Sequence, residues 1–218
     1  MNDYQLCLSK INANYDEQLT FIDVGCNINK IFGGKLDDFT ELFLSLYPNS
    51  KGIGIEPLFW QQYENKWGKD SRITIIKKAL FDGKEKFKNI YVPSIYSSND
   101  HGLSSLYKRK IFSDKYQEIE IECVALDSVA ANLKINYINY VKIDTEGSEL
   151  SILKGSQNLL KDKKIKYIQI EYGGTYDDAE YTIFDIIKFL NTFDYELCHK
   201  TTNYSDCGSF GELLFITR

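Results

Sequence analysis

The sequence predicts an α/β protein in which a mostly parallel sheet is flanked by helices. Short apolar runs that end in a turn recur along the 218 residues, and segments with apolar residues at helical spacing separate them. Strands that alternate with helices form parallel sheets covered on both faces, joined by right-handed crossovers. Because no linker, low-complexity tract or internal repeat divides the chain, we expect residues 1–218 to form a single domain.

The first third of the chain supplies three predicted strands and two predicted helices. The strands are the apolar runs Thr20–Val24, Gly52–Glu56 and Ile73–Ile76. A brief helix is expected between the last two, through Trp60, Tyr63 and Trp67. The other helix follows the first strand, and its apolar residues keep helical spacing until a Pro-Asn pair: Leu36, Phe39, Leu42, Phe43 and Leu46.

The middle of the chain is less regular. Phe87–Val92 and Glu118–Val124 are predicted strands, and the second alternates cleanly between apolar and polar residues. Between them, Pro93–Tyr116 is rich in Ser, Asn, Asp, Gly and Tyr and predicts a long loop. Since long loops in compact domains are commonly functional, we expect residues 93–116 to take part in ligand binding.

Regular alternation returns in the last third. Predicted strands over Tyr140–Asp144 and Ile165–Glu171 flank a helix from Ser148 to Leu160. The strands Tyr195–His199 and Leu213–Thr217 close the chain, and we expect them to be antiparallel neighbours. The helix before them is amphipathic, with Ile183, Ile186, Ile187, Leu190 and Phe193 on its apolar face.

Composition narrows the class of function. A net charge of −5 argues against a protein that binds nucleic acid nonspecifically, and no apolar run approaches a membrane span of about 20 residues. The start of the sequence lacks the basic and apolar regions of a signal peptide. The five cysteines are an odd number and form no C-x-x-C pair, which is typical of reduced thiols. We therefore expect a cytoplasmic protein.

Carboxylates mark the ends of several predicted strands. Glu56, Asp144 and Glu171 lie at strand ends, and Asp23 lies just before one. In an open α/β sheet, ligands bind at the carboxyl ends of the strands. Gly25 follows the first strand and allows a ligand to approach the backbone closely. Glu56, which closes the second strand, is placed to accept hydrogen bonds from the two hydroxyls of a ribose.

This arrangement suits either a dinucleotide or S-adenosylmethionine. The dinucleotide fingerprint has three glycines as G-x-G-x-x-G, whereas this turn contains only Gly25, with Asn27 in the second position. Fewer glycines suit a cofactor that has no pyrophosphate to bind. The turn alone is also compatible with a purely structural role.

The stretch Val141–Leu150, with Leu153-Lys154-Gly155 after it, resembles the hallmark of the FkbM family of methyltransferases, a K-I-D-x-E-G-x-E strand–turn–helix followed by L-K-G. The resemblance extends from about Phe21 to Glu171. Its further motifs are Asp23-Val24-Gly25-Cys26-Asn27, Glu56-Pro57, Ala79-Leu80, Asp82-Gly83, Ser104-Ser105-Leu106 and Leu126-Asp127-Ser128. Two positions depart from the pattern: Cys26 stands for the usual alanine and Asn29 for the usual glycine.

The resemblance implies a Rossmann-like class I methyltransferase fold, with a mostly parallel seven-stranded sheet whose last strand is antiparallel. It also implies an S-adenosylmethionine-dependent O-methyltransferase that modifies a hydroxyl, often of a sugar, glycolipid or polyketide. The expected cofactor-binding residues comprise the first turn, the ribose carboxylate, the adenine wall and the second motif: Asp23, Gly25, Cys26, Asn27, Glu56, Pro57, Ala79, Leu80, Asp144 and Glu146.

Methyl transfer to an alcohol requires positioning and a group that removes the proton. We predict Asp144 as base or substrate anchor, Glu171 as its assistant, and His101 of the long loop as a lesser candidate. Lys142 lies on the same side of its strand as Asp144, and we expect it to pair with Asp127 or Asp144, with a catalytic role as the alternative. Glu146 has an alternative role, capping the next helix with Ser148. Whether the carboxylates share a proton or hold a divalent cation stays open.

The expected partner is a sugar or glycan hydroxyl acceptor, bound under residues 93–116, where Tyr96 and Tyr107 could stack on a sugar ring. Two alternatives stay open. One is an RNA ribose methyltransferase, since Lys142 and Asp144 resemble the lysine–aspartate pairs of such enzymes, although the acidic balance argues against a nucleic-acid partner. The other is a catalytically silent cofactor-binding domain that serves as a partner in an assembly.

Overall fold

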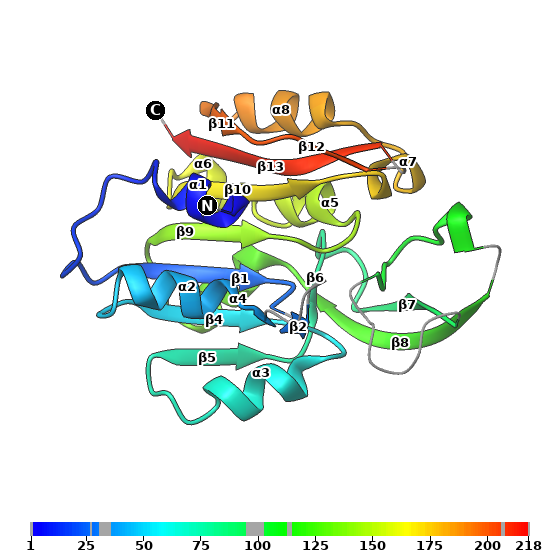
Figure 1. Ribbon diagram of the computed structural model, residues 1–218, viewed down its shortest axis with the longest axis horizontal. Coiled ribbons are helices and arrows are strands. Elements are labelled where there is room, and N and C mark those ends of the chain that lie inside the picture. The colour runs from blue at the N-terminus through cyan, green and yellow to red at the C-terminus, as the bar shows by residue number, and fades with distance from the viewer. Residues whose placement is uncertain are drawn as a thin grey trace.

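The computed structural model describes residues 2–26, 28–30, 36–94, 103–112, 115–205 and 208–217. Seven strands follow one another across the central sheet in the order β5-β4-β1-β9-β10-β13-β11, and a short eighth strand, β12, pairs with β13 beside this path (Figure 1). The five strands from β5 to β10 are parallel, and β13 runs antiparallel between β10 and β11. Their bounds are β1 Thr20–Val24, β4 Lys51–Ile55, β5 Ile73–Ile76, β9 Ile138–Ile143, β10 Ile165–Tyr172, β11 Tyr195–Lys200 and β13 Gly208–Thr217. This is the predicted mostly parallel seven-stranded sheet with an antiparallel last strand.

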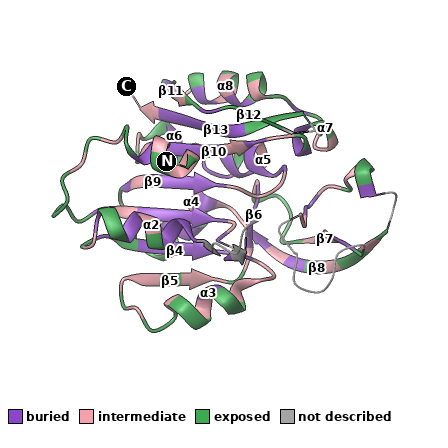
Figure 2. Cartoon of the chain, viewed as in Figure 1, coloured by how far each residue is buried: buried purple, intermediate pink, exposed green. Residues whose placement is uncertain are grey.

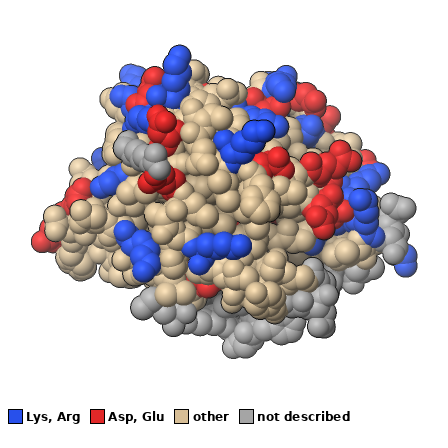
Figure 3. Space-filling view, turned by 90° about the horizontal axis from the view of Figure 1, so that it is seen from above, with Lys and Arg blue, Asp and Glu red and all other residues tan. Residues whose placement is uncertain are grey.

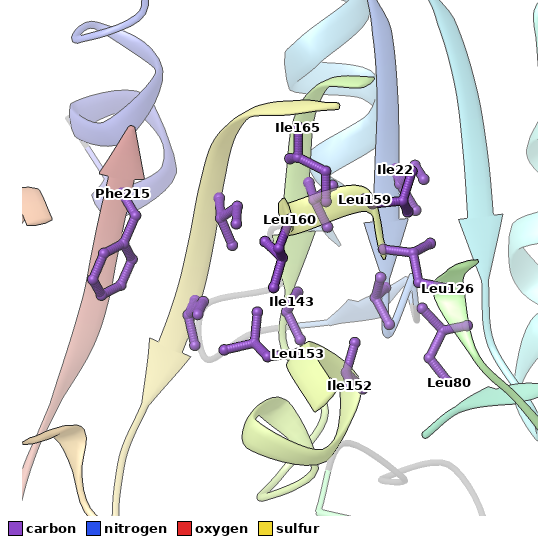
Figure 4. Close-up of a cluster of buried hydrophobic side chains, with 14 of the residues drawn as sticks. Ile22, Leu80, Leu126, Ile143, Ile152, Leu153, Leu159, Leu160, Ile165 and Phe215 are labelled. Carbon is purple, nitrogen blue, oxygen red and sulfur yellow. The ribbon is translucent and has the colours of Figure 1, made fainter. Parts of the chain in front are cut away.

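Helices cover both faces of the sheet because successive strand residues point to opposite sides. Ile22 and Val141 belong to one core, and their neighbours Phe21 and Tyr140 to the other. Side chains from β1, β9, α5 and α6 converge in the larger core (Figure 4), and the inner strands β1, β4, β9 and β10 are buried along most of their length (Figure 2). The helices of this larger core are α4 Leu126–Asn132, α5 Glu149–Lys154, α6 Gln157–Lys161 and α8 Ile183–Asn191.

The second core is smaller and aromatic. Phe21 stacks on Phe43 with ring centroids 4.4 Å apart, and Phe39 stacks on Tyr140 at 5.8 Å. Two helices supply it, α1 Asp3–Leu8 and α2 Phe39–Leu46. A third helix, α3 Trp60–Trp67, places Tyr63 against Gly54, where a Cβ atom would meet the tyrosine ring at 2.4 Å.

A second sheet of three strands lies beyond the carboxyl end of the central sheet (Figure 1). It consists of β6 Ala79–Leu80, β8 Tyr116–Val124 and β7 Phe87–Pro93, and the last two form an antiparallel ribbon. Two further strands, β2 Asn29–Lys30 and β3 Leu36–Asp37, pair with each other, and β12 Asn203–Ser205 pairs with the start of β13.

The predicted loop at 93–116 is partly structured. Ser105 forms a bridge to Tyr91, and a short 3-10 helix covers Lys110–Phe112. His101 and Tyr96 lie outside the described residues.

Two predicted boundaries are wrong. Leu36 belongs to β3 and not to the following helix, which begins at Phe39 after the N-cap Asp38. The helix expected over Ser148–Leu160 is two helices, because Gly155 packs where a Cβ atom would lie 2.1 Å from the carbonyl oxygen of Phe81.

Three helices were not predicted from the sequence: α1, α4 and the one-turn helix α7 Thr175–Asp178. In the part of the chain that the structure describes, no helix has the length and apolar character of a membrane span.

Candidate active site

A cavity of about 300 Å³ lies at the carboxyl ends of β1, β4, β9 and β10. It brings together all the predicted site residues that the structure describes: Asp23, Gly25, Cys26, Glu56, Pro57, Ala79, Leu80, Lys142, Asp144, Glu146 and Glu171. Asn27 and His101 lie outside the described residues. The cavity occupies the place where open α/β sheets bind their ligands.

Gly25 permits the close approach of two strand ends. Its φ is +74°, a conformation that side chains other than hydrogen disfavour, and a Cβ atom would lie 1.9 Å from the carbonyl oxygen of Asp144. The amide of Asp144 in turn donates to the carbonyl of Val24 at 3.2 Å. The two motifs of the sequence therefore meet backbone to backbone.

Lys142 lies between two carboxylates at the bottom of the cavity. Its Nζ is 3.1 Å from Asp144 Oδ2 and 3.4 Å from Asp23 Oδ1, and the side chain is only 5% exposed. Burial by itself would lower the pKa of Lys142, but the charges of Asp144 and Asp23 outweigh it and raise the pKa. The lysine therefore stays charged, as a structural partner requires.

The expected pairing of Lys142 with Asp127 or Asp144 is confirmed, and Asp144 is the partner of the two. The Asp127 carboxylate accepts hydrogen bonds from the amides of Asn158 and Leu159, at 2.9 and 3.0 Å. Because those amides belong to the first turn of α6, they have no partner within the helix, and Asp127 satisfies them.

The carboxyl groups of Asp144 and Glu171 are hydrogen-bonded to each other. Burial tends to raise the pKa of Asp144, but the charge of Lys142 and the bonds from Glu171 and Tyr4 lower it overall. Burial and the neighbouring charge of Asp144 raise the pKa of Glu171 well above its usual range. The two pKa values therefore move in opposite directions, which is typical of two carboxyl groups that lie too close together to ionise independently.

Glu56 presents one oxygen to the cavity. Its Oε1 accepts hydrogen bonds from the amides of Leu58 and Phe59, at 2.9 and 3.0 Å. Burial raises the pKa of this carboxyl, whose residue is 7% exposed. Within the described part of the chain, Oε2 has no hydrogen-bond partner, so it is available to a ligand.

The turn between β9 and α5 is held by Glu149, a residue that the sequence analysis missed. Its Oε1 accepts from the amide and hydroxyl of Thr145, both at 2.9 Å, and Oε2 accepts from the Tyr181 hydroxyl at 2.7 Å. The second glutamate of the E-G-x-E motif was the available signal. Its position as the first residue of α5, directly after the N-cap Ser148, lets its side chain reach back to the turn.

Glu146 does not cap the helix, contrary to the alternative considered for it. The N-cap residue Ser148 makes no side-chain cap bond, and Glu146 instead pairs with Arg109 at 3.2 Å. Burial raises the pKa of Glu146 to about 8. Since Ser105 Oγ also donates to the carbonyl of Glu146 at 2.6 Å, the segment after β7 is fastened to this turn and forms a wall of the cavity with Ser104 and Leu106.

The ionisable side chains that line the cavity are mostly acidic. Two lysines line it, Lys78 and Lys142, and Lys78 is engaged by Glu122 at 2.8 Å. The carboxyl groups that line it are Asp23, Asp38, Glu56, Asp144, Glu146 and Glu171. Such a cavity favours a cationic ligand and disfavours an anionic one. No group of three or more His, Cys, Asp or Glu side chains among the described residues could hold a metal ion.

The outer surface shows no comparable excess of one charge on the face seen in Figure 3. On the face seen in Figure 3, Lys and Arg side chains are interspersed with Asp and Glu and do not gather in one basic patch. This face therefore lacks the electrostatic footprint of a nucleic-acid-binding surface.

A family model described as Methyltransferase FkbM domain matches residues 23–197. Solved structures with the same fold include the METTL16 methyltransferase domain (TM-score 0.52, 9% identity, covering 99% of this chain and 80% of that one). Magnesium protoporphyrin IX methyltransferase of Synechocystis PCC 6803 with bound S-adenosylmethionine also has this fold (TM-score 0.51, 8% identity, covering 99% of this chain and 76% of that one). TrmK of M. capricolum in complex with S-adenosylhomocysteine is similar as well (TM-score 0.51, 13% identity, covering 99% of this chain and 67% of that one). No curated protein matches the chain.

Proposed function

Since the chain belongs to the FkbM family of methyltransferases, we propose that it transfers the methyl group of S-adenosylmethionine to a hydroxyl oxygen of a sugar, a glycan or a related compound. The observation that carries the proposal is the acidic cavity at the strand ends, in which Asp144 is held ionised beside Lys142 and Glu171.

The residues of the cavity fit S-adenosylmethionine better than a dinucleotide. The cofactor carries a positive sulfonium and a positive ammonium group, which an acidic cavity attracts, whereas a pyrophosphate would be repelled. Glu56 Oε2 would accept from the ribose hydroxyls, with Pro57, Ala79 and Leu80 beside the adenine. Asp23, Gly25 and Cys26 would lie at the methionine end, with Asn27 as a further candidate. When bound, the cofactor supplies an electrophilic methyl group.

Asp144 is placed to orient the acceptor and take its proton. A hydroxyl oxygen becomes strongly acidic as it bonds to a methyl group, so a carboxylate with a lowered pKa is basic enough to accept the proton at that stage. The raised pKa of Glu171 favours its protonated form, whose single O–H faces Asp144, and its other oxygen can accept a hydrogen bond from a hydroxyl of the acceptor. Lys142 keeps Asp144 ionised and does not itself exchange a proton.

The acidic lining also bears on the kind of acceptor. A neutral sugar hydroxyl meets no electrostatic penalty here, while an RNA phosphate backbone would meet several carboxyl groups at the cavity. For this reason we propose a sugar or glycan rather than an RNA ribose as acceptor. Ser104, Glu146 and Glu171 line the cavity and would hydrogen-bond such a molecule.

Two measurements test the proposal. Calorimetry should detect binding of S-adenosylmethionine and none of NAD. Transfer of a labelled methyl group should then occur to a panel of sugars and oligosaccharides and not to RNA. Absence of binding would contradict the cofactor assignment, and transfer to RNA alone would contradict the acceptor class.

Asp144→Asn tests the assigned base. It should lower turnover by about 100-fold while the cofactor still binds, since one positioned acid–base group contributes about this much. Asp16→Asn, at an exposed aspartate, is the matched control and should keep full turnover. An Asp144→Asn variant with normal turnover would show that Asp144 is not the base.

A further inference from the structure

The helix α1 (Asp3–Leu8) precedes the family-matched residues 23–197 and yet contributes to the cavity. It is firmly held. Asn2 and Gln5 form a reciprocal capping box at its start, and Cys7 and Leu8 are buried in the aromatic core. Asn203 of β12 donates to Asp3 at 2.6 Å. The helix is thus part of the packed structure, and one of its residues, Tyr4, lines the cavity.

Tyr4 is the side chain through which α1 reaches the cavity. Its hydroxyl donates a hydrogen bond to Asp144 Oδ2 at 3.0 Å, across 140 positions of sequence. The ring meets Phe39 edge-on, with centroids 5.6 Å apart, and Lys142 Nζ lies 5.6 Å from the ring centroid. Packing on one side and a cation on the other fix the phenol in place.

The same carboxylate oxygen therefore has two donors, Tyr4 and Lys142. Lys142 and Glu171 hold the carboxylate from neighbouring strands, and the Tyr4 hydroxyl adds a donor from a separate element that further restricts its rotation. Groups facing Asp144 from the surrounding elements are Lys142, Asp23, Glu171, Glu146, Glu212 and Tyr4. Among them, Tyr4 comes from the helix that the family model does not reach.

We propose that Tyr4 is a positioning residue for methyl transfer, which fixes the Asp144 carboxylate so that it meets the acceptor hydroxyl in one orientation. This inference rests on the proposed function, in which Asp144 takes the acceptor's proton. Tyr4 acts through Asp144 and needs no contact with the cofactor. An element outside the family domain thus completes the active site.

Tyr4→Phe tests the inference, because it keeps the ring against Phe39 and Lys142 and removes only the hydroxyl. We expect turnover to fall about tenfold, as for the loss of one hydrogen bond to a charged group, with the affinity for S-adenosylmethionine changed less than twofold. The acid limb of the pH–rate profile should move to higher pH, since the lost bond stabilised the ionised form of Asp144. Tyr195→Phe, which loses a buried hydroxyl bond to Ile165 far from the cavity, should change neither quantity.

A carbon-detected NMR titration of the Asp144 carboxyl group separates this inference from the proposed function. If the wild-type protein methylates no acceptor, the proposed function fails, and the titration still shows whether Tyr4 holds the carboxylate. An Asp144 titration that is the same in Tyr4→Phe and wild type overturns the inference. So does an equal loss of turnover in Tyr4→Phe and Tyr195→Phe.

Discussion

Glu212 offers a quantitative test of the electrostatics around the site. It lies on β13 directly opposite Glu171 of β10 and is only 4% exposed. Burial, followed by the negative charge of Asp144, raises its pKa to about 8. Glu212→Gln keeps the shape of the side chain and removes its ability to ionise.

The expected magnitude follows from linkage between proton binding and folding. An ordinary glutamate has a pKa of 4.5, so the pKa values of Glu212 in the folded and unfolded states lie about 3.5 pH units apart. Each pH unit corresponds to about 1.36 kcal/mol, so the difference amounts to about 5 kcal/mol of folding free energy. The folded-state pKa is the raised one. The contribution of Glu212 to stability is therefore fully present below pH 4.5 and is lost as the pH rises through 8. Water that enters when Glu212 ionises makes about 5 kcal/mol an upper limit.

Urea unfolding followed by circular dichroism at intervals from pH 4.5 to 8 measures this. The free energy of unfolding of Glu212→Gln, relative to wild type, should rise by about 1 kcal/mol per pH unit over this range. Glu120→Gln, at an exposed position of β8, is the control and should follow the wild type throughout. A difference between Glu212→Gln and wild type that stays constant with pH would refute the reasoning.

Three further substitutions probe the framework of the cavity. Gly25→Ala should lower the free energy of unfolding by about 3 kcal/mol or more in urea titrations, because it combines backbone strain with a clash; Gly208→Ala shares the positive φ without the clash and should cost less, about 1–3 kcal/mol. Glu149→Ala leaves several buried donors of the motif turn without an acceptor, and a loss of about 3 kcal/mol by the same assay is expected, whereas Glu149→Gln should lose less. Lys142→Met leaves buried carboxylates unpaired and should destabilise the protein by about 3–5 kcal/mol at pH 7. Protonation of Asp144 should shrink that deficit at pH 5, and an equal deficit at both values would contradict the ion-pair account.

The position of the cavity could be predicted from the sequence because its parts follow from local pattern. Parallel strands bring their carboxyl ends to one edge, so residues such as Glu56 and Asp144 at strand ends must meet there. The hydrogen bond between Asp144 and Glu171 follows in the same way, from neighbouring strands with carboxylates at matching positions. Hydrophobic periodicity and the order of the strands are therefore sufficient to predict where the cavity lies and which carboxyl groups meet there.

What the sequence could not supply depends on packing between distant segments. Tyr4 lies in a short helix without a strong pattern, and only the packing of α1 on α2 and β13 carries its hydroxyl to Asp144. The choice of Asp144 over Asp127 as partner of Lys142 was similarly hidden, since both follow apolar residues and only the three-dimensional position of α6 assigns Asp127 to its amides. Leu36 had helical spacing, but Asp38 stops the helix from extending to it, because its side chain accepts from the amide of Glu41 as an N-cap.

The energetic cost of the cavity and its proposed use are two aspects of one arrangement. Burial raises the pKa of Glu56, Glu146 and Glu171, so the protein holds carboxyl groups at pH 7 in a place where ionising them is unfavourable. A cationic ligand reverses this balance, because its positive charge stabilises the ionised forms that burial disfavours. The binding of a sulfonium cofactor would therefore offset part of the free energy that it costs to ionise these buried carboxyl groups. By the same argument a neutral or anionic nucleotide would gain nothing from these groups, and the acidic lining itself becomes the basis of cofactor choice.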